Sequence, residues 1–197
     1  MLLRLNHMDY KQSDFYHFNS DSTCLVQYIL KKNSHPKYIL DLCAGCGVIG
    51  LELCQNLNHL ISLDFVDVLS ENTELITDNI KLFSKNNITT NIYTSSIGEF
   101  NPSSKYDLIV CNPPYFTQGN GRESPNYNRQ VSRTFMIDSP EVLILKAKSL
   151  LTKNGKFFFL IPNNEMVWSK LIDKYSLQIQ EKLEKASIYL LSKSDTN

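Results

Sequence analysis

The segment with the clearest chemical character is Asn112-Pro113-Pro114-Tyr115-Phe116, which directly follows the apolar run YDLIVC. Its prolines restrict the backbone, so the Asn112 side chain and the Pro113 carbonyl can both direct acceptors at one ligand. An amine conjugated to a ring or carbonyl is a poor nucleophile, because its lone pair is delocalised. Two acceptors on its N–H groups favour the pyramidal form and aim the lone pair at an electrophile. Tyr115 offers a flat face to a planar substrate, and Phe116 an apolar wall.

A second segment could bind a nucleotide-like cofactor. Gly45, Gly47 and Gly50 spell G-x-G-x-x-G between an apolar strand and a predicted helix, where a sharp turn exposes backbone N–H groups. Asp67 ends the next predicted strand, at the distance where a carboxylate can accept from two ribose hydroxyls, as in sites for NAD or S-adenosylmethionine (SAM). Asp41 favours SAM, because it can face the positively charged amino-acid end that NAD lacks.

These segments must be positioned by a sheet, and alternating strands and helices predict one that is doubly wound and mainly parallel. We expect a Rossmann-like α/β fold of seven strands with an antiparallel C-terminal edge strand. Ser20 or Asp21 is expected to cap the first helix, and Asn154-Gly155 to end the helix that begins near Pro140. The single predicted domain (1–197) comprises an N-terminal segment and helix (1–36), a SAM-binding and catalytic core (37–162) and a C-terminal helix with edge strands (163–197).

The order of the two motifs, DLCAGCGVIG (41–50) before NPPY (112–115), resembles the class I SAM-dependent methyltransferases that act on exocyclic or amide nitrogens. Residues 18–22 (FNSDS), and the continuation of NPPY into Phe116, Gln118-Gly119 and arginines, are similar to the bacterial tRNA1(Val) adenine-37 N6-methyltransferase family. The resemblance covers roughly residues 15–162. It implies SAM as the cofactor and the N6 amine of an adenine in tRNA, or in another RNA, as the methyl acceptor.

The resemblance also implies roles for individual positions. The Asn-Pro-Pro-Tyr segment holds the adenine and is catalytic, and the glycine loop with Asp67 binds SAM. In such enzymes the third strand often ends in an Asp that meets the SAM adenine amine. Ser96 stands in that place and could accept the same hydrogen bond more weakly. The expected cofactor-binding residues are Asp41, Cys43, Ala44, Gly45, Gly47, Asp67, Ser96, Ile97 and Asn112.

Residues 117–135 form a long polar stretch that carries Arg122, Arg129 and Arg133, with Tyr127 between them. Arginines can form bidentate hydrogen bonds with phosphates, and a tyrosine can stack on a base. Long loops in compact domains are usually functional, so we expect these arginines, with Tyr115 and Phe116, to bind the RNA substrate. The alternative is a solvated surface loop.

Composition limits the remaining possibilities. Formal net charge is zero over 197 residues, so any RNA contact must come from a local basic patch. Five cysteines, an odd number without metal-site spacing, indicate reduced thiols rather than disulfides, and no metal is expected. Neither a signal peptide nor a membrane-length apolar run is visible. We therefore expect a cytoplasmic enzyme, active as a monomer.

Three other functions compete with RNA methylation. Protein glutamine methyltransferases of the release-factor type share Asn-Pro-Pro-Tyr, but they carry a helical domain before the core, and only about 37 residues precede the first strand. A SAM-binding protein without catalytic activity is a second alternative, against which the intact Asn112 and Tyr115 argue. A dinucleotide oxidoreductase is the third, and no partner residue for hydride transfer is evident.

Overall fold

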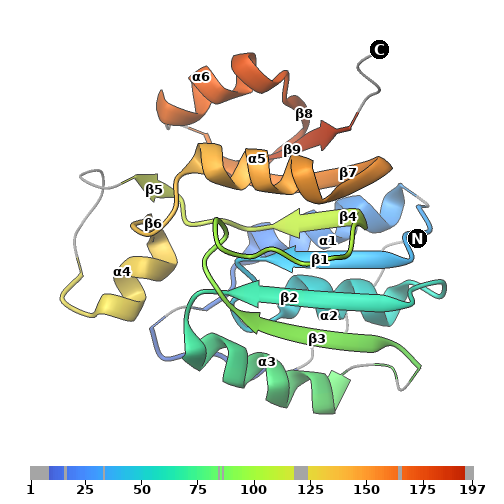
Figure 1. Cartoon of the computed structure of the whole chain (residues 1–197). Helices are drawn as coiled ribbons and strands as arrows, with labels where there is room; N and C mark the ends of the chain where they lie inside the picture. Colours follow the sequence, from blue (N-terminus) through green and yellow to red (C-terminus); the bar gives the residue numbers. More distant parts are fainter. Residues whose placement is uncertain are drawn as a thin grey trace.

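The computed structural model describes residues 9–15, 17–32, 34–83, 85, 87–117, 124–163 and 166–193. Within this part of the chain, seven strands form one sheet in the order β3-β2-β1-β4-β7-β9-β8 (Figure 1). Strands β3, β2, β1, β4 and β7 are parallel, and β9 pairs antiparallel with both β7 and β8. The strands cover Tyr38–Leu42 (β1), Ser62–Asp67 (β2), Thr89–Thr94 (β3), Tyr106–Cys111 (β4), Leu151–Pro162 (β7), Gln178–Lys182 (β8) and Ala186–Ser192 (β9).

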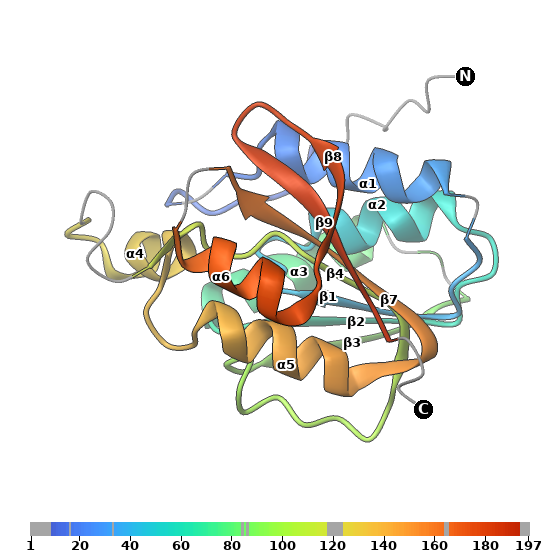
Figure 2. The same cartoon turned by 90° about the horizontal axis from the view of Figure 1, so that it is seen from above.

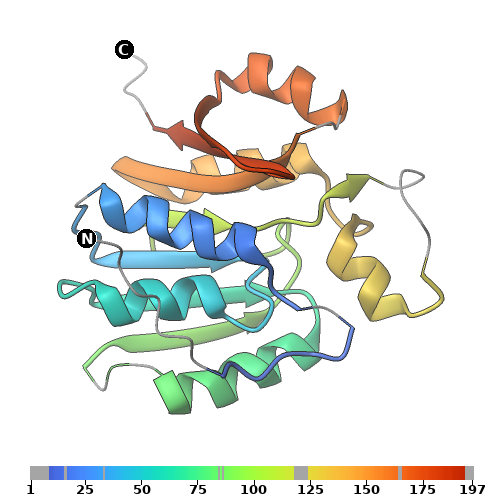
Figure 3. The ribbon, with the colours of Figure 1, turned by 180° about the vertical axis from the view of Figure 1, so that it is seen from behind.

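Helices cover both faces of this sheet, and Figures 2 and 3 show the two layers. Helices α1, α2 and α3 bury their apolar side chains in a core on one face, and α5 and α6 do so on the other. This arrangement confirms the predicted fold class. The helices of the described residues are Ser20–Lys31 (α1), Val48–Asn56 (α2), Ser70–Phe83 (α3), Tyr127–Arg133 (α4), Pro140–Leu150 (α5) and Met166–Tyr175 (α6).

The first helix is capped one residue before the predicted positions. Asn19 has an extended backbone, and its side-chain oxygen accepts hydrogen bonds from the N–H groups of Asp21 and Ser22. Such an oxygen satisfies donors that the first helical turn leaves unpaired. Asp21 and Ser22 therefore lie inside the helix, and their side chains reach the candidate site described below.

The helix before β7 ends earlier than predicted. It stops at Leu150, and Asn154-Gly155 lies within β7 instead. A Cβ on Gly155 would lie 2.8 Å from the carbonyl oxygen of Tyr106, where the pairing of β4 with β7 shifts register. Gly155 is thus required by the close approach of two strands and not by a helix end.

The expected long loop after Asn-Pro-Pro-Tyr contains regular structure. Strands Phe116–Thr117 (β5) and Thr134–Phe135 (β6) form a short parallel pair, and α4 lies between them in sequence. Asn126 caps α4 by accepting a hydrogen bond from the N–H of Arg129. Figure 1 shows this unit beyond the carboxyl ends of the parallel strands. Residues 118–123, and with them Arg122, lie outside the described residues.

The five cysteines are free, and Cys46, Cys54 and Cys111 are buried. None of the helices in the described part of the chain combines the length and the hydropathy that crossing a membrane requires. Over the same residues, no group of three or more His, Cys, Asp or Glu side chains is arranged to hold a metal ion.

Candidate active site

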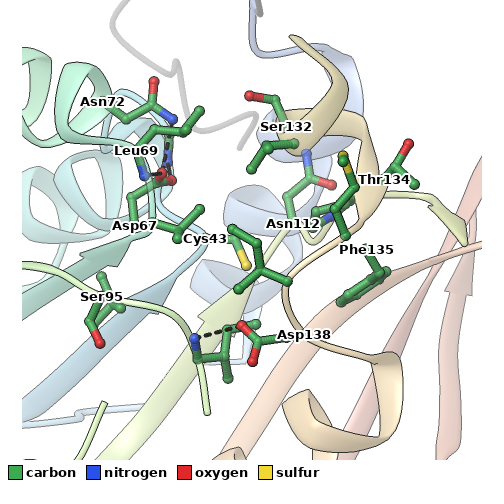
Figure 4. Close-up of a pocket in the computed structure, with 18 residues that line it drawn as sticks. Cys43, Asp67, Leu69, Asn72, Ser95, Asn112, Ser132, Thr134, Phe135 and Asp138 are labelled. Atoms are coloured by element: carbon green, nitrogen blue, oxygen red, sulfur yellow. Dashed lines mark hydrogen bonds between the residues drawn. The ribbon is translucent and has the colours of Figure 1, made fainter. Parts of the chain in front are cut away.

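A pocket opens beyond the carboxyl ends of the first four parallel strands (Figure 4). Ligands of open α/β sheets bind at this edge. A second pocket lies between the glycine loop and the N-terminal segment. The two pockets adjoin, because both are lined by Cys43, Gly45, Asn72 and Asn112. Together they form one continuous candidate site with two ends.

The glycine loop bends over this pocket edge. Gly45 and Gly47 have backbone φ angles of 56° and 81°, a region that favours glycine, and Cys43 adopts a similar value of 54°. The Ala44 N–H donates to the Val66 carbonyl (3.0 Å) and the Gly47 N–H to the Ala44 carbonyl (2.8 Å). The loop is therefore held to the end of β2 and leads directly into α2.

Asp41 lies beneath the loop and does not line either pocket. Its side chain is fully buried, and its Oδ2 accepts a hydrogen bond from the Gly50 N–H at 2.8 Å. Its Oδ1 has no hydrogen-bond partner among the described residues. Burial raises the pKa of Asp41 well above its ordinary value. The structure thus gives Asp41 a role in shaping the loop, and direct contact with a cofactor amine stays a prediction.

Asp67 lines the larger pocket, but protein donors already use much of its carboxylate. Its Oδ1 accepts from the Leu69 N–H and from Asn72 Nδ2, both at 3.0 Å, and its Oδ2 accepts from the Gly45 N–H at 2.8 Å. Burial raises the pKa of Asp67, and these hydrogen bonds partly offset the rise. The Val68 N–H also bonds to this carboxylate, so a ribose hydroxyl at Asp67 would share its oxygens with protein donors.

Ser96 does not occupy the position expected for it. The pocket wall after β3 is formed by Ser95 and Ile97, whereas Ser96 is buried and its hydroxyl donates to Glu99 Oε2 at 2.9 Å. The chain turns at this point, since the Phe100 N–H donates to the Ser96 carbonyl. This turn directs the Ser96 side chain away from the pocket, and its contact with a ligand stays a prediction.

Asn112 is the polar side chain best placed to act on a substrate. It follows β4, lines both pockets, and its Nδ2 donates to the Ser22 hydroxyl at 2.9 Å. Its Oδ1 is buried and has no hydrogen-bond partner within the described residues. Ser22 therefore fixes the orientation of the Asn112 amide (Figure 4). The Nδ2 end is bonded to Ser22, and the Oδ1 end is left to accept a hydrogen bond from a ligand.

The rest of the Asn-Pro-Pro-Tyr-Phe segment is anchored to the fold. Pro113 is buried, and Pro114 lines the larger pocket. Tyr115 is half-buried against the core on the α1–α3 face, and its hydroxyl donates to Asp21 Oδ2 at 3.1 Å. Phe116 begins β5. Stacking of Tyr115 on a substrate remains a prediction, since Tyr115 does not line either pocket.

The two described arginines of the predicted RNA-binding stretch lie one helical turn apart on α4. Arg129 and Arg133 are both exposed. The Arg129 guanidinium donates to the Asp14 carbonyl at 3.5 Å, and the Arg133 guanidinium lies 5.9 Å from the ring centre of Phe116. The arginine patch is therefore built on a helix that covers the pocket, because Val131 and Ser132 of the same helix line it.

Sequence reasoning missed several residues of the site. Asp21 was expected only as a possible helix cap and Ser22 had no individual role, although these residues hold Tyr115 and Asn112. Asn72 could have been found from its place in the first turn of the helix after β2. No local pattern indicates Asp138, which lines the pocket beside the turn that follows β3.

A family model described as the methyltransferase small domain matches residues 16–192. The chain is 34% identical over 142 residues to the tRNA1(Val) (adenine(37)-N6)-methyltransferase of Flavobacterium psychrophilum, covering 68% of this chain and 56% of the relative. The protein of that name from Pedobacter heparinus is 32% identical over 124 residues, covering 63% and 51%. The chain thus spans about half the length of the curated relatives it matches.

Solved structures show the same fold. The Thermus thermophilus 16S rRNA N2 G1207 methyltransferase, in complex with AdoMet and guanosine, matches with a TM-score of 0.66 at 17% identity, over 90% of this chain and 44% of that one. The ribosomal protein L11 methylase of Lactobacillus delbrueckii matches with a TM-score of 0.61 at 17% identity, over 89% and 79%. One is named for an RNA and the other for a protein, so this likeness shows the fold and not the substrate. The family match includes both the glycine loop and the Asn-Pro-Pro-Tyr segment, and the chain belongs to the methyltransferase small domain family.

Proposed function

We propose that this protein is a SAM-dependent methyltransferase that transfers a methyl group to the exocyclic N6 amine of an adenine in tRNA. Its family and the names of its relatives support this class of reaction. The observation that carries the proposal is the hydrogen bonding of the Asn112 amide, which follows β4. Its nitrogen is bonded within the protein, and its buried Oδ1 lacks a partner among the described residues.

The two adjoining pockets, called the cofactor groove from here on, offer groups that suit the parts of SAM. SAM, when bound, supplies a methyl group carried on a positively charged sulfur. The larger pocket offers Asp67 to a ribose hydroxyl and an apolar wall to an adenine ring. The smaller pocket runs along the glycine loop at Cys43 and Gly45 toward α1 and can hold the amino-acid end. Asn112 lines both pockets, so its side chain lies at the junction of the two.

At that junction the protein acts by positioning and by accepting hydrogen bonds. The Asn112 Oδ1 and the Pro113 carbonyl accept the two N–H groups of the substrate amine and favour its pyramidal form. With SAM held in the adjoining pockets, the lone pair so aimed would form the N–C bond as the C–S bond breaks, and the bonding pair would stay with the sulfur. A proton leaves the nitrogen for solvent afterwards, so the transfer itself requires no general base.

The RNA would approach over α4. Arg129 and Arg133 present two cationic groups on the helix that covers the pocket. Guanidinium groups pair with phosphates in a forked geometry, and backbone contacts position a nucleic acid without reading its sequence. These arginines support RNA as the substrate, and the tRNA in particular rests on the relatives' names.

The direct test incubates the protein with labelled SAM and total unmodified tRNA, followed by mass analysis of the nucleosides. N6-methyladenosine is expected from the wild type, and Asn112→Ala is expected to lower the rate about a hundredfold or more. Asn101→Ala, which alters an exposed asparagine between β3 and β4, is the matched control and should act as wild type. No label in the tRNA would contradict the proposal.

A further inference from the structure

Asp138 is a carboxylate in the pocket with no role in the proposed mechanism. It lies between β6 and α5, and Figure 4 shows it across the pocket from Asp67. Among the described residues that line this pocket, Asp67 and Asp138 are the two with ionisable carboxyl groups, and none is basic. A carboxylate beside a ligand pocket without a cationic partner is suited to a neutral group with N–H or O–H donors.

The backbone holds Asp138 in place. Its Oδ2 accepts a hydrogen bond from the Ile97 N–H at 2.8 Å, and its Oδ1 accepts from the Gly98 N–H at 3.0 Å. These donors use two of about four acceptor sites of the carboxylate, so at least one site remains for a ligand. A Cβ on Gly98 would lie 3.0 Å from Oδ1, so the glycine permits this close approach. The carboxylate is thus anchored to the turn after β3, where Ile97 forms part of the pocket wall.

An adenosine carries N–H or O–H donors at both of its ends, which is the chemistry that two carboxylates on opposite sides of a pocket can accept. An adenosine has a ribose diol at one end and an exocyclic amine on the far edge of its base, with a flat ring between them. Asp67 lies at the end of β2, Asp138 lies across the pocket, and apolar side chains including Leu69 and Ile97 line the space. Ser96, which the sequence placed at the amine, is turned toward Glu99.

We propose that Asp138 accepts a hydrogen bond from the 6-amino group of the cofactor's adenine ring and so selects adenine over other purines. This inference rests on the proposed function, because it takes SAM as the ligand. A carboxylate that accepts from an amine also repels the carbonyl oxygen of an inosine base at the same position. Discrimination between the two bases follows from this one contact.

Calorimetry with S-adenosylhomocysteine and S-inosylhomocysteine tests the inference, because the two ligands differ by an amine and a carbonyl at the base. A hydrogen bond to a charged group corresponds to roughly a 10- to 100-fold preference of the wild type for the adenosyl ligand. Asp138→Ala should reduce the preference to about twofold or less, chiefly by weakening the adenosyl ligand. Asp138→Asn, whose amide can donate to the carbonyl, should favour the inosyl ligand. Ser96→Ala should keep the wild-type preference, which separates Asp138 from the position that the sequence favoured, and Asn101→Ala is the neutral control.

Three results would overturn the inference: equal binding of the two ligands by the wild type, an undiminished preference in Asp138→Ala, or tighter adenosyl binding by that variant. The last would mean that the carboxylate occupies the place of the ring. Thermal melting of each variant shows whether it is folded. Failure of the folded wild type to bind S-adenosylhomocysteine would instead remove the proposed function itself, so the two failures are distinguishable.

Discussion

Removing the Ser22 hydroxyl tests the idea that a residue on α1 orients the catalytic amide. The Ser22 side chain is 3% exposed, and its Oγ accepts the hydrogen bond from Asn112 Nδ2 at 2.9 Å. In Ser22→Ala this N–H has lost its acceptor. The amide can regain a partner only by moving or by turning over, which directs a donor at the substrate amine in place of the acceptor.

The expected loss follows from the burial of this contact. Leaving a buried donor unsatisfied costs about 1–3 kcal/mol. If the active orientation of the Asn112 amide becomes less favourable by that amount, turnover falls by about 5- to 150-fold. Affinity for SAM should change less than turnover, because the Ser22 hydroxyl is already bonded to Asn112, although Ser22 also lines the smaller pocket. The loss should be smaller than that of Asn112→Ala, which removes the acceptor itself.

Single-turnover methylation of unmodified tRNA, with S-adenosylhomocysteine affinity measured alongside, provides the assay. Ser20→Ala is the matched control, since Ser20 is an exposed residue of the same helix. In Ser22→Ala, a wild-type rate would refute the orienting role. A large loss of cofactor affinity with an unchanged rate at saturation would show that Ser22 shapes the groove instead.

Three further predictions concern the loop, the buried acid and α4. Gly50→Ala should lower the free energy of unfolding by about 1–3 kcal/mol, because its Cβ would lie 2.7 Å from the Phe65 ring. Urea unfolding measures this change, and an unchanged free energy would contradict the close packing of Gly50 against Phe65. Burial raises the pKa of Asp41, so the folded state keeps a proton that the unfolded chain loses above about pH 4. The proton on Asp41 therefore stabilises the folded state fully below this pH, and this contribution is lost as the pH rises toward the raised pKa. In urea unfolding without cofactor, the wild type should lose stability relative to Asp41→Asn from pH 4 to 8. Parallel stability curves of the two proteins would exclude this linkage. Replacing Arg129 and Arg133 by Gln should reduce the salt dependence of tRNA binding by about one unit of slope per lost phosphate contact, at unchanged cofactor affinity, and an identical slope would limit α4 to covering the pocket.

The fold could be predicted largely because its signals are local. An apolar run such as YDLIVC specifies a buried strand, and Gly45 and Gly47 specify a turn with positive φ angles. The boundaries were less certain where a local signal had two explanations. Gly155 is a plausible helix end in sequence, but in the fold it allows β7 to approach the Tyr106 carbonyl. The polar composition of residues 117–135 concealed α4, because a short helix of this kind is stabilised by its cap and by contact with the fold.

The sequence by itself determined the family features of this protein: the alternating strands and helices, the glycine loop after β1, and an asparagine and two prolines after β4. Tertiary structure decided how the side chains are used. The Asn112 amide is oriented by Ser22, which is 90 residues away, and Asp138 is anchored by the N–H groups of Ile97 and Gly98, about 40 residues away. The physical reason is that residue spacing reports backbone conformation and strand register over a few residues. Which donor meets which acceptor depends on how distant elements pack, and no local pattern contains that information.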